Sequence, residues 1–335
     1  MLVNIFRSLS PQWKRWLKHV SLIVAVAISI FLLLLPFVAN SYVLHVMIMI
    51  FLFIGLASGL NLVVGYCGQL SFAQGAFASI GAYTCAISMR LFGLSFWIAI
   101  VASALVSGLF GLLLGLPTLR LRGDYLGIVT LGFGEIVRLV FLNWTSVTRG
   151  PLGLSGIPAP TMFGITLAGR QPFYYLCLVF TLLTVFFFIR RLISSGVGLS
   201  MQAVHSDETA AEAIGINPFK FKLIAFVLSS AFAGIVGCIY ASYIGFVNPD
   251  TFAYNDSLTA LAMVTLGGSG SIIGPIVGAI LLTSIPEIFR SIVKYRMVIY
   301  GLAMVLMMIF RPGGIWGAGR RRINIYRDIA RKGKA

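Results

Sequence analysis

Charge is scarce in this sequence, and negative charge is the scarcest. Only 9 of the 335 residues are Asp or Glu, against 25 Lys or Arg, so charged residues make up 10% of the chain. A soluble domain is about a quarter charged, so this composition excludes an ordinary soluble protein. Hydrophobic residues make up 59%, and 36 glycines suit close helix packing in lipid. The composition predicts an all-α fold, a polytopic transmembrane helical bundle without a large extramembrane domain.

Residue types that build metal and catalytic sites are also few. The four cysteines show no C-x-x-C spacing and the three histidines are isolated: Cys67, Cys85, Cys177, Cys238, His19, His45 and His205. We therefore expect no metal site and no bound cofactor. No Ser-His-Asp set or carboxylate pair stands out, so the protein is not expected to be an enzyme. The glycine-rich phosphate loop ending in GK[ST] is missing as well, so ATP hydrolysis would have to come from other subunits.

The net charge of +16 does not indicate a nucleic-acid-binding protein, because the basic residues are not gathered on one face. They lie at the ends of apolar segments: Arg7, Lys14, Arg15, Lys18, Arg190, Arg191 and 320–322. This is the positive-inside pattern of membrane proteins. It predicts cytoplasmic N- and C-termini.

Apolar runs predict about ten spans, with roughly eight as the lower bound. Their ranges are 19–38, 42–64, 68–89, 94–116, 125–143, 173–189, 223–244, 255–266, 272–285 and 297–310. The permease-like bundle occupies 20–315, after a basic leader at 1–19 and before a basic cytoplasmic tail at 316–335. A Gly- and Pro-rich loop at 144–171 is expected outside, and a polar segment at 190–222 in the cytoplasm.

The polar segment 190–222 contains a predicted short helix. Ser206 is a good N-cap, Asp207 and Glu208 place negative charge in the first turn, and Gly215 is a plausible stop. Between them, Ala210, Ala211 and Ala213 predict a small, smooth face. Eight helical residues span about 12 Å, too short to cross a bilayer. The helix fits docking into a groove of a soluble partner, although a solvated loop helix has the same pattern.

A charged residue inside a span is costly and marks a candidate functional site. Glu135 lies near the middle of the 125–143 span, and Arg138 follows one turn later on the same face. The pair offers complementary charges to a zwitterionic amino acid, or it locks two helices together. Gln69, Ser71 and Gln74, in the small and polar 68–89 span, are further candidates for the translocation path, although such groups often only bridge neighbouring helices.

Several long strings in the chain resemble one family. They are 65–72 (GYCGQLSF) with 75–77, the run 119–140 (LRLRGDYLGIVTLGFGEIVRLV), 207–217 (DETAAEAIGIN), and 267–270 (GGSG) with 274–275 and 278–279. Together they resemble LivM-type permease subunits of the high-affinity branched-chain amino acid ABC importer family. The resemblance covers about residues 40–315. The chain departs from the family at Leu199, Gln202 and His205, where arginines are usual.

The resemblance implies a type II ABC importer-like permease in a bacterial inner membrane. The helix at Asp207–Gly215 is then the element that couples the permease to the ATPases. The implied partners are a second homologous permease, two ATP-binding cassette subunits that use ATP, a periplasmic binding protein and an amino-acid substrate. A urea or short-amide permease shares much of this pattern. A stand-alone secondary transporter would need ion-coupling carboxylates in several spans, but only Glu135 is clearly deep.

Overall fold

The computed structural model describes residues 31–118, 124–162, 165–288, 296–310 and 313–316. This part of the chain is mostly helical, as predicted. The predicted leader at 1–19, most of the first span, and nearly all of the tail at 316–335 lie outside the described residues.

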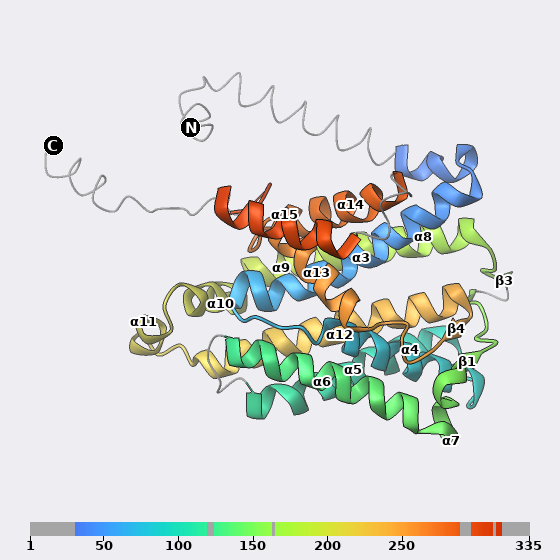
Figure 1. The fold of residues 1–335 in the computed structure, drawn as a ribbon, viewed down its shortest axis with the longest axis horizontal. Coiled ribbons are helices and arrows are strands. Elements are labelled where there is room, and N and C mark those ends of the chain that lie inside the picture. Colours follow the sequence, from blue (N-terminus) through green and yellow to red (C-terminus); the bar gives the residue numbers. More distant parts are fainter. Residues whose placement is uncertain (1–30, 119–123, 163–164, 289–295, 311–312, 317–335) are drawn as a thin grey trace, which may run out of the picture.

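The helices follow one another with short connections (Figure 1). They are α3 Ser41–Cys67, α4 Gln74–Arg90, α5 Phe96–Thr118, α6 Asp124–Asn143, α7 Thr145–Thr148, η1 Gly150–Leu152, α8 Arg170–Thr181, the π-helical η2 Leu182–Ile189, α9 Arg190–Ser194, α10 Gly196–Ser206, α11 Glu208–Ala213, α12 Pro218–Ile244, α13 Tyr254–Gly267, α14 Ile273–Ile288 and α15 Arg296–Phe310. The described strands are β1 Leu154–Ser155, β2 Thr161–Met162, β3 Ile165–Thr166 and β4 Phe246–Val247.

Five described helices are long and apolar enough to cross a membrane: Ser41–Cys67, Phe96–Thr118, Tyr125–Asn143, Arg170–Ser194 and Pro218–Ile244. Each predicted span after the first coincides with a helix, but α4, α13, α14 and α15 are shorter than these five. The predicted helix start at Gly68 is wrong. The backbone between α3 and α4 is not helical, and α4 begins at Gln74.

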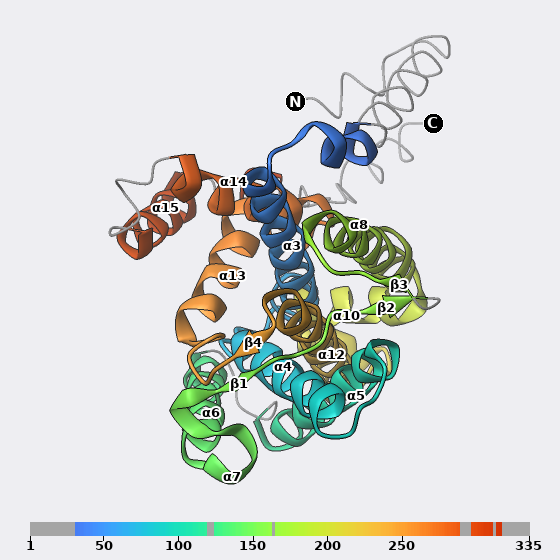
Figure 2. The ribbon, with the colours of Figure 1, turned by 90° about the vertical axis from the view of Figure 1, so that its right-hand side faces the viewer.

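Helix α12 lies at the centre of the bundle, between α3, α4 and α5 (Figure 2). Its contact with α4 is unusually close, because Gly237 has no side chain. A Cβ at Gly237 would collide with the carbonyl oxygen of Ala78 in α4. Small residues at a crossing allow two backbones to touch. Helices in lipid associate through such close packing, because lipid is as apolar as their side chains and no hydrophobic effect drives them together.

The two ends of the bundle differ in structure (Figure 1). Helices α10 and α11 project at one end, and α7 and the short strands cover the other. Strand β1 pairs antiparallel with β4 through Leu154 with Val247 and Ser155 with Phe246. The loop at 144–171 is thereby attached to the segment that follows α12. The segments predicted on opposite sides of the membrane therefore lie at opposite ends of the molecule.

Candidate functional site

The helix predicted in the polar segment is α11, and Asp207 rather than Ser206 caps it. The Asp207 carboxylate accepts a hydrogen bond from the Ala210 amide at 3.0 Å. Ser206 still belongs to α10, where its hydroxyl donates to the Gln202 carbonyl at 2.9 Å. The prediction of Ser206 as the cap is therefore wrong by one residue, because the extended backbone of Asp207 separates α10 from α11.

Gly215 ends α11 as predicted. Its φ of 83° is in the left-handed region, which glycine adopts without steric cost. The Gly215 amide donates to the Glu212 carbonyl and the Ile216 amide to the Ala211 carbonyl. These two bonds form a Schellman motif, so the end of this short helix is fixed by its own backbone.

The alanines of α11 do not share one exposed face. Ala211 is 2% exposed, so it packs against its own chain. Ala210 and Ala213 are exposed, and Ile214 at the end of the helix is 74% exposed. The surface available to a partner therefore includes Ala210, Ala213 and Ile214, beside the exposed Thr209 and Glu212, and Ala211 anchors the helix from behind.

Glu208 also faces its own chain, through a residue that the sequence analysis missed. Its Oε1 lies 2.5 Å from Nζ of Lys222, in the second turn of α12. The Lys222 side chain is 5% exposed and that of Glu208 is 37% exposed. An unpaired ammonium in such a buried position would cost several kcal/mol, so Glu208 compensates the Lys222 charge. Fourteen residues separate the two, so no helical spacing in the sequence indicates the pair.

The Glu135 and Arg138 side chains of α6 meet as the i,i+3 spacing predicts. Nε of Arg138 donates to both carboxylate oxygens of Glu135 at 3.0 Å, and Nη2 donates to Oε1 at 2.6 Å. A third residue, Asp250, was not foreseen. Nη1 of Arg138 donates to its Oδ1 at 3.0 Å. Two carboxylates and one guanidinium leave this triad with a net charge of −1.

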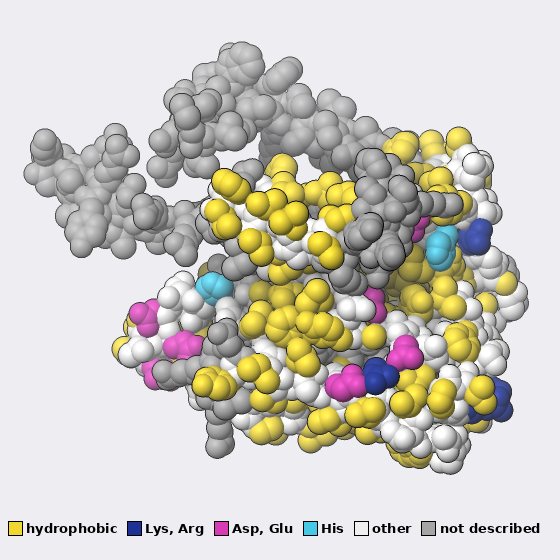
Figure 3. Space-filling view, in the orientation of Figure 1, with side chains coloured by type: hydrophobic (Ala, Val, Ile, Leu, Met, Phe, Trp, Pro, Cys, Tyr) yellow, Lys and Arg dark blue, Asp and Glu magenta, His cyan; other side chains and the backbone are white. Residues whose placement is uncertain are grey.

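The charged triad is exposed on the surface of the single chain. Side-chain exposure is 28% for Arg138, 48% for Glu135 and 66% for Asp250. Figure 3 shows charged side chains gathered over α6 on a face that is otherwise largely hydrophobic. Charges in a membrane span normally face a water-filled path or another protein surface, since contact with lipid is costly. This face of α6 is therefore unsuited to lipid.

A groove between α4, α6 and α13 borders the triad. Of the triad, Glu135 and Arg138 line it, together with Phe72, Ala76, Leu131, Gly134, Phe252, Ala253, Tyr254 and Ser257. The Ser257 hydroxyl accepts a hydrogen bond from the Gly75 amide at 2.8 Å, which ties α13 to α4. The cavity volume is about 30 Å³, and a single water needs roughly 10–15 Å³. The groove in one chain is large enough for water but has no room for an amino acid.

The other predicted path residues, Gln69, Ser71 and Gln74, are buried. Gln74 is buried and bridges two neighbours, with Nε2 donating to the Leu56 carbonyl at 3.1 Å and Ser229 Oγ donating to Oε1 at 3.1 Å. Ser71 is buried, and its Oγ accepts from the Ala73 amide at 3.4 Å. Gln69 is also buried. The structure therefore does not bring these three residues into the groove that borders the triad.

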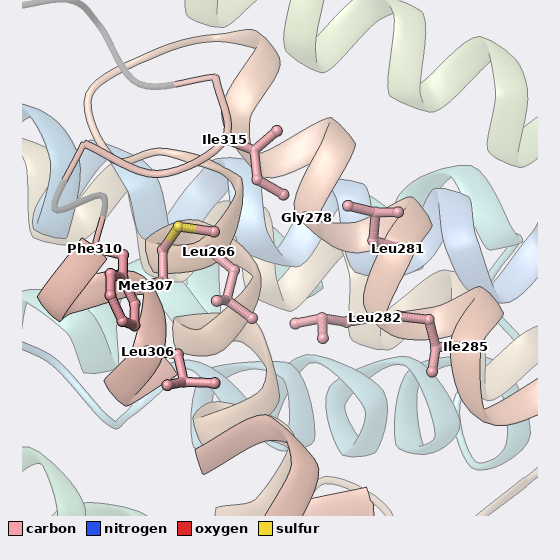
Figure 4. A pocket seen from close by; sticks show the side chains of 9 residues that line it. All are labelled: Leu266, Gly278, Leu281, Leu282, Ile285, Leu306, Met307, Phe310 and Ile315. Carbon is pink, nitrogen blue, oxygen red and sulfur yellow. The ribbon is translucent and has the colours of Figure 1, made fainter. Parts of the chain in front are cut away.

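A larger cavity lies between α13, α14 and α15, with a volume of about 360 Å³ (Figure 4). Its lining is apolar: Leu266, Gly278, Leu281, Leu282, Ile285, Leu306, Met307, Phe310 and Ile315. It offers nothing to the charged ends of an amino acid. Among the described residues, no group of three His, Cys, Asp or Glu side chains is arranged to hold a metal ion.

Comparison with known proteins gives a consistent result. The family described as "Branched-chain amino acid transport system / permease component" matches residues 42–309. The high-affinity branched-chain amino acid transport system permease protein LivM of Salmonella typhimurium is 37% identical, covering 97% of this chain and 85% of its own length. Its namesake in Escherichia coli is 36% identical, covering 98% and 87%.

A more distant relative is the autoinducer 2 import system permease protein LsrC of Escherichia coli. It is 27% identical, covering 76% of this chain and 74% of its own length. No solved structure gives a significant match.

Proposed function

The chain belongs to the family of branched-chain amino acid transport system permease components, and on this premise we propose that it forms the translocation path for leucine, isoleucine and valine in an ATP-driven importer. The proposed substrate rests on the 37% identity to a LivM protein over 97% of this chain. The autoinducer 2 permease is less similar, at 27% identity.

The proposed path runs along the face of α6 that carries Glu135 and Arg138, with Asp250 beside them through its ion pair with Arg138. Two exposed charges, Glu135 and Arg138, on a helix of spanning length support this placement, because contact with lipid would leave them unsolvated. The small groove beside them supplies one wall, and a second homologous permease supplies the other. Gln74 contributes indirectly, by joining α3 and α12 behind this wall, and Gln69 and Ser71 lie in the segment that leads into α4.

The chain is proposed to bind no cofactor and to hydrolyse no ATP. Two ATP-binding cassette subunits dock at the exposed surface of α11, with Ala210, Ala213 and Ile214 in the contact and Asp207 and Gly215 fixing the helix ends. A periplasmic binding protein delivers the amino acid at the opposite end, near β1 and β4. No nucleic acid takes part.

The proposed setting is a bacterial inner membrane crossed about ten times. Helices near each predicted span from 42 to 310 support that number, with 190–222 and both termini in the cytoplasm and 144–171 outside. The bundle at 20–315 acts as one permease domain.

The experiment is uptake by cells that lack their own branched-chain amino acid and urea importers and express the complete system. We expect uptake of labelled leucine, abolished when this chain is omitted, and no uptake of labelled urea. Uptake of urea alone would assign the chain to urea transport. Leucine uptake that persists without the ATPase subunits would identify a secondary transporter.

A further inference from the structure

Lys222 is the one charged side chain that is buried in the part of the chain that the structure describes. It lies outside the proposed path. Lys222 is near the start of α12, at the α10–α11 end of the bundle, whereas Asp250 follows the other end of α12. Its partner Glu208 is the first residue of the helix proposed to dock the ATPases. A buried lysine that pairs with this helix needs an explanation.

Two attachments join α11 to α12. The first is covalent, since only residues 214–217 separate the helices and Asn217 caps α12 by accepting from the Lys220 amide at 3.2 Å. The second is the ion pair between Glu208 and Lys222 at 2.5 Å, from the other end of α11. Buried Ala211 also holds α11 against the chain. The ion pair adds a fixed point at the first residue of α11, one α11 length from the connection at 214–217, and ties that end to α12.

Helix α12 then leads into the middle of the bundle. It packs against α3, α4 and α5, and at Gly237 its backbone touches that of α4. Gln74 of α4 is hydrogen-bonded to Ser229 of α12. Helix α4 in turn lines the groove beside the triad through Ala76. A displacement of α12 therefore reaches the wall of the proposed path through direct contacts.

We infer that the Glu208–Lys222 ion pair makes α11 and α12 move as one body and so transmits the motion of the ATPase subunits to the path. Glu208 and Lys222 are positioning residues, because neither touches substrate or nucleotide. The inference rests on the proposed function, since it takes the partner of α11 to be an ATPase. It assigns Glu208 an internal role in place of a contact with that partner.

The test uses the complete transporter in proteoliposomes, with three measurements: retention of the ATPase subunits, ATP hydrolysis, and leucine taken up per ATP hydrolysed. The main variant is Lys222→Met, which keeps side-chain length and leaves Glu208 partly solvated. The matched control is Lys220→Met, an exposed lysine two residues away on the same helix. The rescue variant is the charge swap Glu208→Lys with Lys222→Glu.

We expect Lys222→Met to keep its ATPase subunits and hydrolyse ATP, but to take up at least about tenfold less leucine per ATP. Lys220→Met should stay within about twofold of the unaltered complex, and the charge swap should recover most of the loss. Equal leucine uptake per ATP in Lys222→Met and the unaltered complex would overturn the inference. It would also be overturned by a charge swap that assembles but does not recover leucine uptake per ATP, because the ion pair would then not account for the loss.

If Lys222→Met does not assemble, the charge swap decides. A swap that assembles and transports supports the link, and one that does not assemble limits the pair to a folding role and overturns the inference. Failure of the proposed substrate is recognised separately, because the unaltered complex would then take up no leucine. The pair is in that case judged by the rise in ATP hydrolysis on adding the binding protein with its own ligand.

Discussion

Arg138 of α6 and Asp250, 112 residues further along the chain, form an ion pair with Nη1 and Oδ1 3.0 Å apart. The same guanidinium is held by Glu135 through three further hydrogen bonds. Asp250 lies in the turn between β4 and α13. The contact therefore joins α6 to the segment that leads into α13, along the groove proposed as one wall of the path.

Asp250→Asn tests this contact. The carboxylate is 66% exposed, and exposed ion pairs contribute about 0–1 kcal/mol to stability. We therefore expect the variant to assemble with unchanged thermal stability. If the triad lines the path, the initial rate of leucine uptake should fall at least about fivefold, and Asp250→Glu should retain most of it. Wild-type uptake by Asp250→Asn would remove this residue from the path.

Replacing both Glu135 and Arg138 with apolar residues separates transport from structure. An ion pair that is replaced as a unit is often neutral for stability, whereas loss of Arg138 alone leaves the Glu135 charge uncompensated. Asp250 loses its partner in both variants, but its side chain is 66% exposed. We expect Glu135→Leu with Arg138→Met to fold and assemble but not to transport, and Arg138→Met alone to assemble less well. Thermal unfolding and leucine uptake measure the two effects. A fully active double variant would show that the pair is purely structural.

Two tryptophan substitutions distinguish the two sides of α11. Ala210 is exposed and Ala211 is 2% exposed. Ala210→Trp should leave the isolated chain as stable as before and prevent co-purification of the ATPase subunits. Ala211→Trp should destabilise the chain itself, because overpacking costs about 1–3 kcal/mol. Normal ATPase binding by Ala210→Trp would show that this surface is not where the ATPases dock.

The proposed orientation predicts the accessibility of two exposed serines. Ser155 lies in β1 and Ser206 at the end of α10, at opposite ends of the bundle. We expect single cysteines at these positions, in a chain with its four buried cysteines replaced, to react with an impermeant thiol reagent from opposite faces of the membrane. Labelling of both from the same face would contradict the proposed topology.

Local patterns in the sequence predicted local structure well. The left-handed stop at Gly215 and the Glu135–Arg138 pair depend on residues within a few positions of one another, so their spacing was sufficient. Lys222 and Asp250 were missed because their partners are 14 and 112 residues away. The inward orientation of Ala211 was also not predictable, because small residues are found at buried and exposed positions alike.

The most direct test of the central claim is uptake of labelled leucine by proteoliposomes that contain the purified complex, with the binding protein on the side where it delivers and ATP on the side of the ATPase subunits. We expect accumulation against a gradient that requires ATP, this chain and the ATPase subunits together. Accumulation without ATP, or ATP-driven accumulation that is unchanged when this chain is left out, would contradict its assignment as the path of an ATP-driven importer.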